Sequence, residues 1–157
     1  QEGELLPVIS PVGYPRDKRS VVDRMFRMVA SSDKRKPWHE LFYLHDTDTF
    51  LDRENSGRFD TPLECVRVAP SASNKQPWRI IKDQGQNAFH FYLKRTPGYE
   101  NIIKHIRLQN VDMGIAMCHF ELSARELGVK GDWAVNDPQT KKDGMEYIVS
   151  WIAHDRA

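Results

Sequence analysis

Residues 70–78 read Pro-Ser-Ala-Ser-Asn-Lys-Gln-Pro-Trp, and this stretch decides how the rest of the chain is interpreted. It follows a short apolar helical pattern and precedes a strand-like run. The prolines at both ends fix φ and push the residues before them out of the α region, so the loop between them is stiff. Its hydroxyls, amides and single cation can offer hydrogen bonds to a flat polar ligand. An ordinary turn, with an Asx-turn at Asn74, explains the same residues.

A second polar feature lies earlier in the chain, where Lys34, Arg35 and Lys36 precede Pro37. Arginine offers a planar fork to a phosphate and lysine offers a point charge. A helix that begins at the proline would add its positive N-terminal end. Three adjacent cations are more often a solvated surface, and an anion-binding interaction module is a further interpretation.

Composition places the chain among globular proteins with one core. It has 157 residues, of which 39% are apolar and 29% are charged. A formal net charge of +1 gives no general attraction to nucleic acid or to an anionic membrane. The longest apolar runs are too short to span a bilayer. Cys65 and Cys118 are too few for a disulfide framework, so we expect buried free thiols and a cytoplasmic location.

The first 57 residues give weaker patterns than the rest. A strand at 5–12 is interrupted by two prolines, which favours a sheet edge. Residues 18–29 have helical periodicity. A short helix is expected around Trp38 to Phe42, and residues 45–57 read as a loop.

From residue 60 onward the patterns are clearer. Asp-Thr-Pro at 60–62 predicts a helix start with one of the first two residues as its cap. Two strands should follow at 78–82 and 88–94, joined by a hairpin turn at 83–87. Trp78 opens the first strand and is expected in the core. The inward side chains of the helix would be Leu63, Val66 and Ala69.

The longest helical pattern runs from Tyr99 to Gly128, and its last glycine suits a left-handed C-terminal cap. Gly114 costs about 1 kcal/mol against alanine inside a helix, so we expect close approach of either a neighbouring helix or a cofactor. Asp112 is interpreted as an exposed or N-terminal helical charge. Closing strands are predicted at 129–135 and 145–153. The predicted inner stripe of the helix consists of Leu108, Val111, Ile115, Cys118 and Leu122.

Familiar catalytic motifs are missing from the sequence. It has no G-x-S-x-G, no P-loop and no G-x-G-x-x-G, and its six histidines have no metal-ligand spacing. His-Asp-Thr-Asp at 45–48 lacks the glycine and distal glutamate of a calcium loop and reads as a surface loop. We therefore assign no catalytic residue and no metal ligand.

Four segments together resemble the FMN-dependent nitroreductase family. The loop at 70–78 is similar to its flavin-contacting loop, and Asp-Met-Gly-Ile-Ala-Met at 112–117, continuing to Gly128, is similar to the long helix that passes the flavin. Gly-Tyr-Pro at 13–15 and Lys-Arg-Lys-Pro at 34–37 resemble the closing strand and the basic phosphate clamp. The resemblance implies an α+β fold: a mixed, mainly antiparallel sheet flanked by helices, including one long central helix.

The resemblance also implies a function and a site. The expected flavoprotein would pass hydride from NAD(P)H through FMN to a nitroaromatic, quinone or similar acceptor. Ser71, Ser73, Asn74 and Gln76 would approach the flavin, together with Gly114. The FMN phosphate would be held by Lys34, Arg35 and Lys36. A non-catalytic flavin- or nucleotide-binding half, or a scaffold half of a larger flavoprotein, is the alternative.

The order of the segments departs from the usual family pattern. The closing strand and the clamp come before the flavin loop, and the opening arginine- and serine-containing segment is missing. A subgroup of the family carries two nitroreductase-like halves in one chain, and we expect this sequence to be its later portion. Residues 1–157 would form one nitroreductase-like domain with 60–157 as its main body. Residues 1–42 would complete a preceding half, and the partner would be such a half or a homodimer mate.

Overall fold

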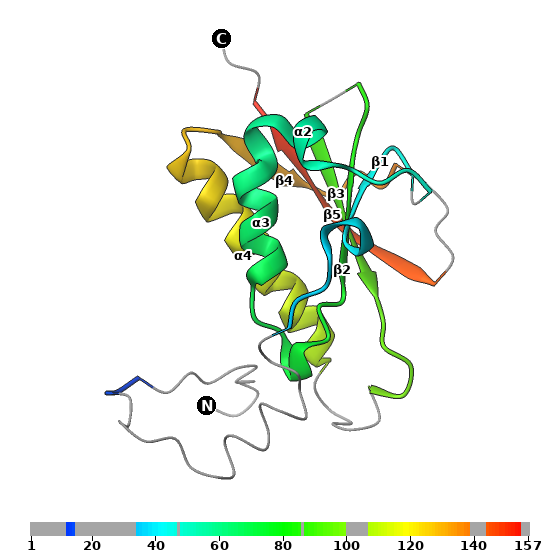
Figure 1. The fold of residues 1–157 in the computed structure, drawn as a ribbon, viewed down its shortest axis with the longest axis vertical. Coiled ribbons are helices and arrows are strands. Elements are labelled where there is room, and N and C mark those ends of the chain that lie inside the picture. Colours follow the sequence, from blue (N-terminus) through cyan, green and yellow to red (C-terminus); the bar gives the residue numbers. More distant parts are fainter. Residues whose placement is uncertain are drawn as a thin grey trace, which may run out of the picture.

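The computed structural model describes residues 12–14, 34–46, 48–85, 87–99, 107–138 and 144–154. The predicted helix at 18–29 lies outside these ranges, as does the predicted strand at 5–12 except for its last residue. The described elements form one mixed sheet with helices on one of its faces (Figure 1).

The sheet has five strands in the order β1-β2-β3-β5-β4. β1 (Phe42–Leu44) is parallel to β2 (Trp78–Lys82), and all other pairs are antiparallel. β2 and β3 (Ala88–Lys94) form a hairpin in which Trp78 pairs with Leu93. β5 (Met145–Ala153) lies between β3 and the short β4 (Gly131–Ala134). The predicted class, a mixed and mainly antiparallel α+β sheet, is confirmed.

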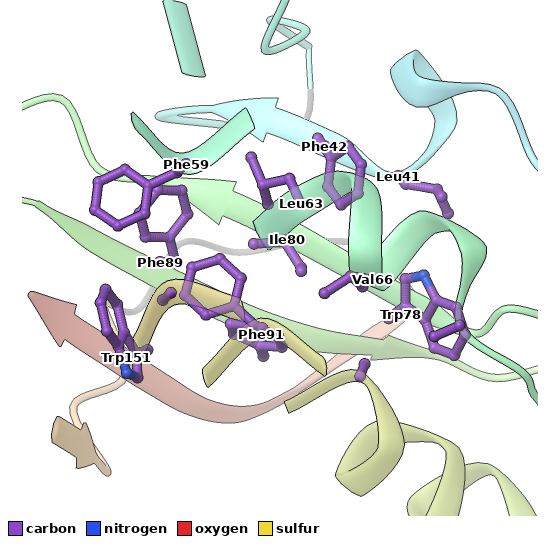
Figure 2. Close-up of a cluster of buried hydrophobic side chains, with 14 of the residues drawn as sticks. Leu41, Phe42, Phe59, Leu63, Val66, Trp78, Ile80, Phe89, Phe91 and Trp151 are labelled. Atoms are coloured by element: carbon purple, nitrogen blue, oxygen red, sulfur yellow. The ribbon is translucent and has the colours of Figure 1, made fainter. Parts of the chain in front are cut away.

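Two helices, α3 (Asp60–Val68) and α4 (Leu108–Glu126), pack against each other and cover one face of the sheet (Figure 1). Their inner sides meet strand residues that alternate toward them, and Figure 2 shows the resulting cluster of aromatic and aliphatic side chains. Each large apolar side chain removed from water contributes about 1.5–3 kcal/mol, so this layer supplies most of the stability. Its largest members are Phe42, Phe59, Phe89, Phe91, Phe120, Trp78 and Trp151.

A tight contact fixes one edge of this cluster. A Cβ added to Gly131 would lie 2.4 Å from Cζ2 of Trp151 and 2.6 Å from the Ile152 carbonyl oxygen. Only glycine therefore allows β4 to lie this close to the indole. The opposite face of the sheet carries a smaller cluster of Tyr43, Ile81 and Tyr92.

The segment before α3 differs from its prediction. Trp38–Glu40 forms a 3-10 turn, η1, and the following residues form β1 instead of a helix. β1 is held by backbone pairing, because the Ile80 N–H donates to the Leu41 carbonyl at 2.8 Å. The predicted loop at 45–57 contains a helical turn, α2 (Arg53–Ser56), capped by the Asp52 side chain.

The start of α3 also differs in detail. A 3-10 turn, η2 (Gly57–Phe59), runs directly into the helix, so Phe59 takes the cap position and no side chain caps it. The proline at 62 lies in the first turn, and Leu63, Val66 and Ala69 are fully buried, as predicted. Trp78 is also fully buried in the core, as predicted.

The long helix is confirmed from residue 108, and Gly128 follows it with φ 72°, as a left-handed cap requires. The predicted inner stripe is wrong at Leu122, which is 56% exposed, and at Cys118, which is also exposed, whereas Ile115 packs against the core. Small and aromatic side chains face α3 and the sheet instead. Cys65 is only half-buried, so neither thiol is fully buried as predicted. The buried side of α4 consists of Gln109, Asp112, Met113, Ala116, Phe120 and Ala124.

Within the described part of the chain, no helix combines the length and the apolar character that crossing a membrane would require.

Candidate functional site

The loop at 70–78 has an unusual backbone. Ser73, Asn74 and Gln76 have φ values of 48°, 54° and 47°, in the left-handed region that non-glycine residues seldom adopt. Such conformations cost of order 1–3 kcal/mol each and persist only where the surroundings hold them. A short turn, η3 (Ala72–Asn74), forms the tip, and the hydroxyl of Ser71 accepts from the Gln76 N–H at 2.9 Å. The loop is therefore closed on itself, and the stiffness predicted from its prolines has a second source.

The structure brings this loop against the basic segment. Nη1 of Arg35 donates to Oδ1 of Asn74 at 3.1 Å, and Nδ2 of Asn74 donates to the Lys34 carbonyl at 2.7 Å. The backbone N–H of Lys36 donates to Oε1 of Gln76 at 2.9 Å. Three hydrogen bonds thus join segments about forty residues apart, and they involve two of the four predicted loop residues. We call the two segments together the loop–cation site.

The three cations differ in how they are engaged. Arg35 also donates through Nε to the Val68 carbonyl at 3.1 Å, so its guanidinium fastens the basic segment to the end of α3. Nζ of Lys36 lies 3.2 Å from Oε2 of Glu40 in a partly exposed ion pair, which is worth little and can exchange for another anion. Lys34 is exposed. The segment can therefore offer positive charge to a phosphate while Arg35 keeps it in place.

Two further predicted residues, Ser73 and Gly114, take no part in these three hydrogen bonds. Ser73 is exposed at the loop tip and accepts at Oγ from the Tyr99 hydroxyl at 3.0 Å. Gly114 lies on the exposed side of α4, and a Cβ placed there would meet nothing within 4 Å. Close approach of a helix of this chain, one of the two explanations of this glycine, is absent from the described residues.

A buried carboxylate lies under the loop. Asp112 is 2% exposed, and its Oδ1 accepts from the Ala72 N–H at 2.8 Å. Oδ2 is also buried and has no hydrogen-bond partner among the described residues. Burial raises the pKa of this carboxyl group, and the hydrogen bond from Ala72 opposes the shift only in part. The sequence interpretation of Asp112 as an exposed or helix-terminal charge is therefore wrong.

A buried guanidinium lies at the other end of the loop. Arg79 is 6% exposed, and its Nη1 donates to the carbonyls of Gln76 at 3.1 Å and Trp78 at 2.6 Å. Burial lowers the pKa of Arg79, while Tyr43 and Glu40 oppose the shift. Sequence reasoning missed this residue, since a charge inside a short strand reads as an outward-facing side chain. Asp112 could have been noticed by its spacing, because Ala116 and Phe120 follow it at intervals of four residues on the buried side of α4.

Two surface cavities lie elsewhere. One of about 260 Å³ is lined by residues at the C-terminal end of α4 and in β4 and β5, including Glu121 and Trp151. The other, of about 430 Å³, lies at the β2–β3 turn. Neither includes a residue of the loop–cation site. The described ranges also contain no group of three or more acidic, histidine or cysteine side chains placed to hold a metal ion.

Comparison with known proteins places the chain in a family. Residues 1–124 match the sequence profile of the family described as "Putative TM nitroreductase", which covers well over half of the chain. The chain therefore belongs to this nitroreductase family, as the resemblance predicted.

One solved structure agrees on the fold. A crystal structure of a "putative nitroreductase" from Thermotoga maritima is 23% identical with a TM-score of 0.51, and the match covers 76% of this chain and 42% of that one. A nitroreductase family protein from Clostridium difficile is 20% identical with a TM-score of 0.49, covering 80% and 81%. The chain thus spans less than half of the length of the Thermotoga protein. No curated protein matches it.

Proposed function

We propose that this chain is part of an FMN-dependent oxidoreductase that uses NAD(P)H to reduce a nitroaromatic, quinone or similar acceptor. Membership of the nitroreductase family supports the oxidoreductase class. The observation that carries the FMN assignment is the direct contact between the polar loop and the basic segment, through Asn74 with Arg35 and through Gln76 with Lys36. A ligand that combines a flat polar ring with a phosphate needs both kinds of surface side by side.

The residues of the site suit this ligand. Ser71, Ser73, Asn74 and Gln76 combine donors and acceptors of the kind that the ring edge and the ribityl hydroxyls require. The cations Lys34, Arg35 and Lys36 suit a phosphate, with Arg35 fixed by the loop and Lys36 paired to a partly exposed glutamate. When bound, FMN supplies the hydride-accepting and hydride-donating chemistry. The chain would contribute placement, charge neutralisation and hydrogen bonds, without a catalytic acid or base.

We further propose that a second nitroreductase-like half, or a second copy of this chain, completes the site. The outer side of α4 supports this, because Leu122 is exposed and no atom of the described residues lies within 4 Å of the position of a Cβ at Gly114. An apolar side chain and an open glycine on a long helix suit close packing by another chain. The greater length of the Thermotoga relative also leaves room for a further half.

FMN titration, followed by flavin fluorescence and visible absorbance, tests the proposal. We expect purified protein to bind FMN saturably, and to oxidise NAD(P)H when an acceptor is added. A longer parent protein should bind more tightly than this segment if a second half completes the site. Binding without NAD(P)H oxidation would favour the non-catalytic half. A colourless protein that takes up no FMN in either form would overturn the proposal and favour an anion-binding module.

A further inference from the structure

We propose that Asp112 and Arg79 are positioning residues for the loop at 70–78. They hold its residues with positive φ in that conformation before any ligand binds. Neither residue belongs to the loop, and both are buried charges at its two ends. The consequence for FMN affinity rests on the proposed function, but the positioning of the loop can be measured in the protein without FMN.

Asp112 fixes the first half of the loop. The backbone N–H of Ala72 is at the start of η3, where no carbonyl of the turn can accept from it. Oδ1 of Asp112 accepts from this N–H at 2.8 Å from the neighbouring helix α4. A carboxylate accepting from a backbone N–H makes a strong hydrogen bond, and burial excludes competing water. The tip of the loop is thereby tied to the longest helix of the fold.

Arg79 fixes the last half of the loop. The Pro77 carbonyl accepts from the Lys94 N–H of β3 at 2.8 Å, so the carbonyl of the next residue points to the other side of the strand. On that side β1 begins to pair only opposite Ile80. Nη1 of Arg79 binds the Trp78 carbonyl in place of a strand partner, and also binds the Gln76 carbonyl. The guanidinium therefore stabilises the turn out of the left-handed residue Gln76.

The two charges act on the same strained segment. Ser73, Asn74 and Gln76 lie between the two attachment points, and all three have left-handed backbones. Without outside bonds such a segment would relax toward the favoured regions of φ and ψ. A loop that already has its ligand-bound conformation loses less conformational entropy when a ligand binds. Loss of the hydrogen bonds from either side chain should therefore loosen the loop first and weaken ligand binding as a result.

The unpaired Oδ2 of Asp112 makes a specific rescue possible. An asparagine keeps one carbonyl oxygen for the Ala72 N–H, and the atom that it changes has no described partner to lose. We therefore expect Asp112→Asn to keep the loop largely restrained and Asp112→Ala to abolish the restraint. A residue needed only to fill space would show no such difference between its polar and apolar replacements.

Amide hydrogen exchange in FMN-free protein, measured by NMR, tests this. Asp112→Ala should speed exchange at Ala72 and Gln76 at least tenfold, and Asp112→Asn less than threefold. Arg79→Met should speed exchange at Gln76, with Arg79→Lys intermediate. Glu121→Ala, which removes another carboxylate of α4, is the matched control and should leave both amides unchanged. Exchange within twofold of wild type in both Asp112→Ala and Arg79→Met would overturn the inference.

A second variant covers a failure of Asp112→Ala to fold. Ala72→Pro deletes the donated N–H itself, and the extended backbone of Ser71 (φ −146°, ψ 158°) accepts a following proline. It should speed exchange at Gln76, and an unchanged rate would count against the inference. If the amides respond as expected while wild type binds no FMN, the positioning role stands and the proposed function fails. If wild type binds FMN and Asp112→Ala binds it equally well, the positioning role fails.

Discussion

The aromatic core and the loop–cation site are stabilised in different ways. The core is a layer of fully buried rings, in which Phe120 contacts Phe89, Phe91 and Trp151 at centroid distances of 5.1 to 5.5 Å. Its stability comes from apolar area and is spread over many contacts. The loop has almost no apolar side chain and keeps its shape through a few hydrogen bonds, several of them to charged groups. A change in the core should therefore alter the stability of the whole fold, whereas a change in the loop should alter ligand binding.

The largest expected effect belongs to the core. Phe120→Ala removes a fully buried ring and should lower the free energy of unfolding by about 3–5 kcal/mol, because it loses burial and leaves a cavity. Denaturant unfolding followed by circular dichroism measures this. Leu122→Ala, two residues away on the exposed side of α4, is the control and should change stability by less than about 1 kcal/mol. Equal losses for the two variants would contradict the assignment of the inner side of α4.

Neutralising the basic segment should affect binding more than stability. Replacing Lys34, Arg35 and Lys36 together by glutamine should weaken FMN binding by about 10- to 100-fold, since charge-assisted hydrogen bonds to the phosphate are lost. Fluorescence titration at fixed ionic strength gives the affinity. The control variant carries glutamine in place of three exposed cations, Arg58, Arg125 and Lys130. These lie near the start of α3 and the end of α4, away from the loop–cation site. Equal affinity in the two triples would remove the phosphate assignment.

A smaller effect is expected at the loop tip. Asn74→Ala should weaken FMN binding by about tenfold, because it removes a side chain that joins the loop to Arg35 and places alanine at φ 54°. Asn74→Gly tolerates this φ and removes the same side chain, so the two variants separate backbone strain from lost hydrogen bonds. FMN titrations of both variants under the same conditions show how much each of these two causes contributes. Wild-type affinity in both variants would exclude Asn74 from the site.

The smallest expected effect concerns pH and the other face of the sheet. Burial lowers the pKa of His90 below 6.5, although Asp83 partly opposes the shift, and Nδ1 lies 2.7 Å from the Ser150 hydroxyl. The folded state thus favours neutral His90. Stability should be full above pH 6.5 and decline as pH falls from 6.5 through the lower folded-state pKa. His90→Gln should flatten this decline in denaturant unfolding between pH 7 and 5, whereas His39→Gln in the exposed η1 should not. Parallel pH profiles for wild type and His90→Gln would show that His90 is not responsible.

Local patterns predicted much of the fold. β2, β3 and β5 have the predicted bounds, because alternating side chains and turn residues define such strands without outside help. The sequence pattern predicts a helix that reaches Phe42, the first residue of β1, because the strand conformation depends on pairing with β2, which is distant in sequence. α4 has apolar residues on two sides, and the sequence pattern predicts that the side with the larger residues faces inward. The smaller Ala116 and Ala124 are buried in the core, because the packing of α4 against α3 and the sheet decides which side faces inward.

The site could be predicted only in part. Residues of the loop and of the basic segment were named from family resemblance, and the structure places the two segments in contact. Asp112 and Arg79 were missed, because a sequence shows charge but not burial, and most charged residues are exposed. All the predicted site residues, Gly114 among them, stay predictions as cofactor contacts.

The position of Asp112 on α4 has a mechanical consequence. Helix α4 carries on its buried side the carboxylate that accepts a hydrogen bond from the loop. On its exposed side it carries the apolar side chain of Leu122. A partner that packs against this outer side of α4 would shift the helix, and the hydrogen bond from the Ala72 N–H to Asp112 would shift with it. Assembly and ligand capture would then be thermodynamically linked, each strengthening or weakening the other by the same factor.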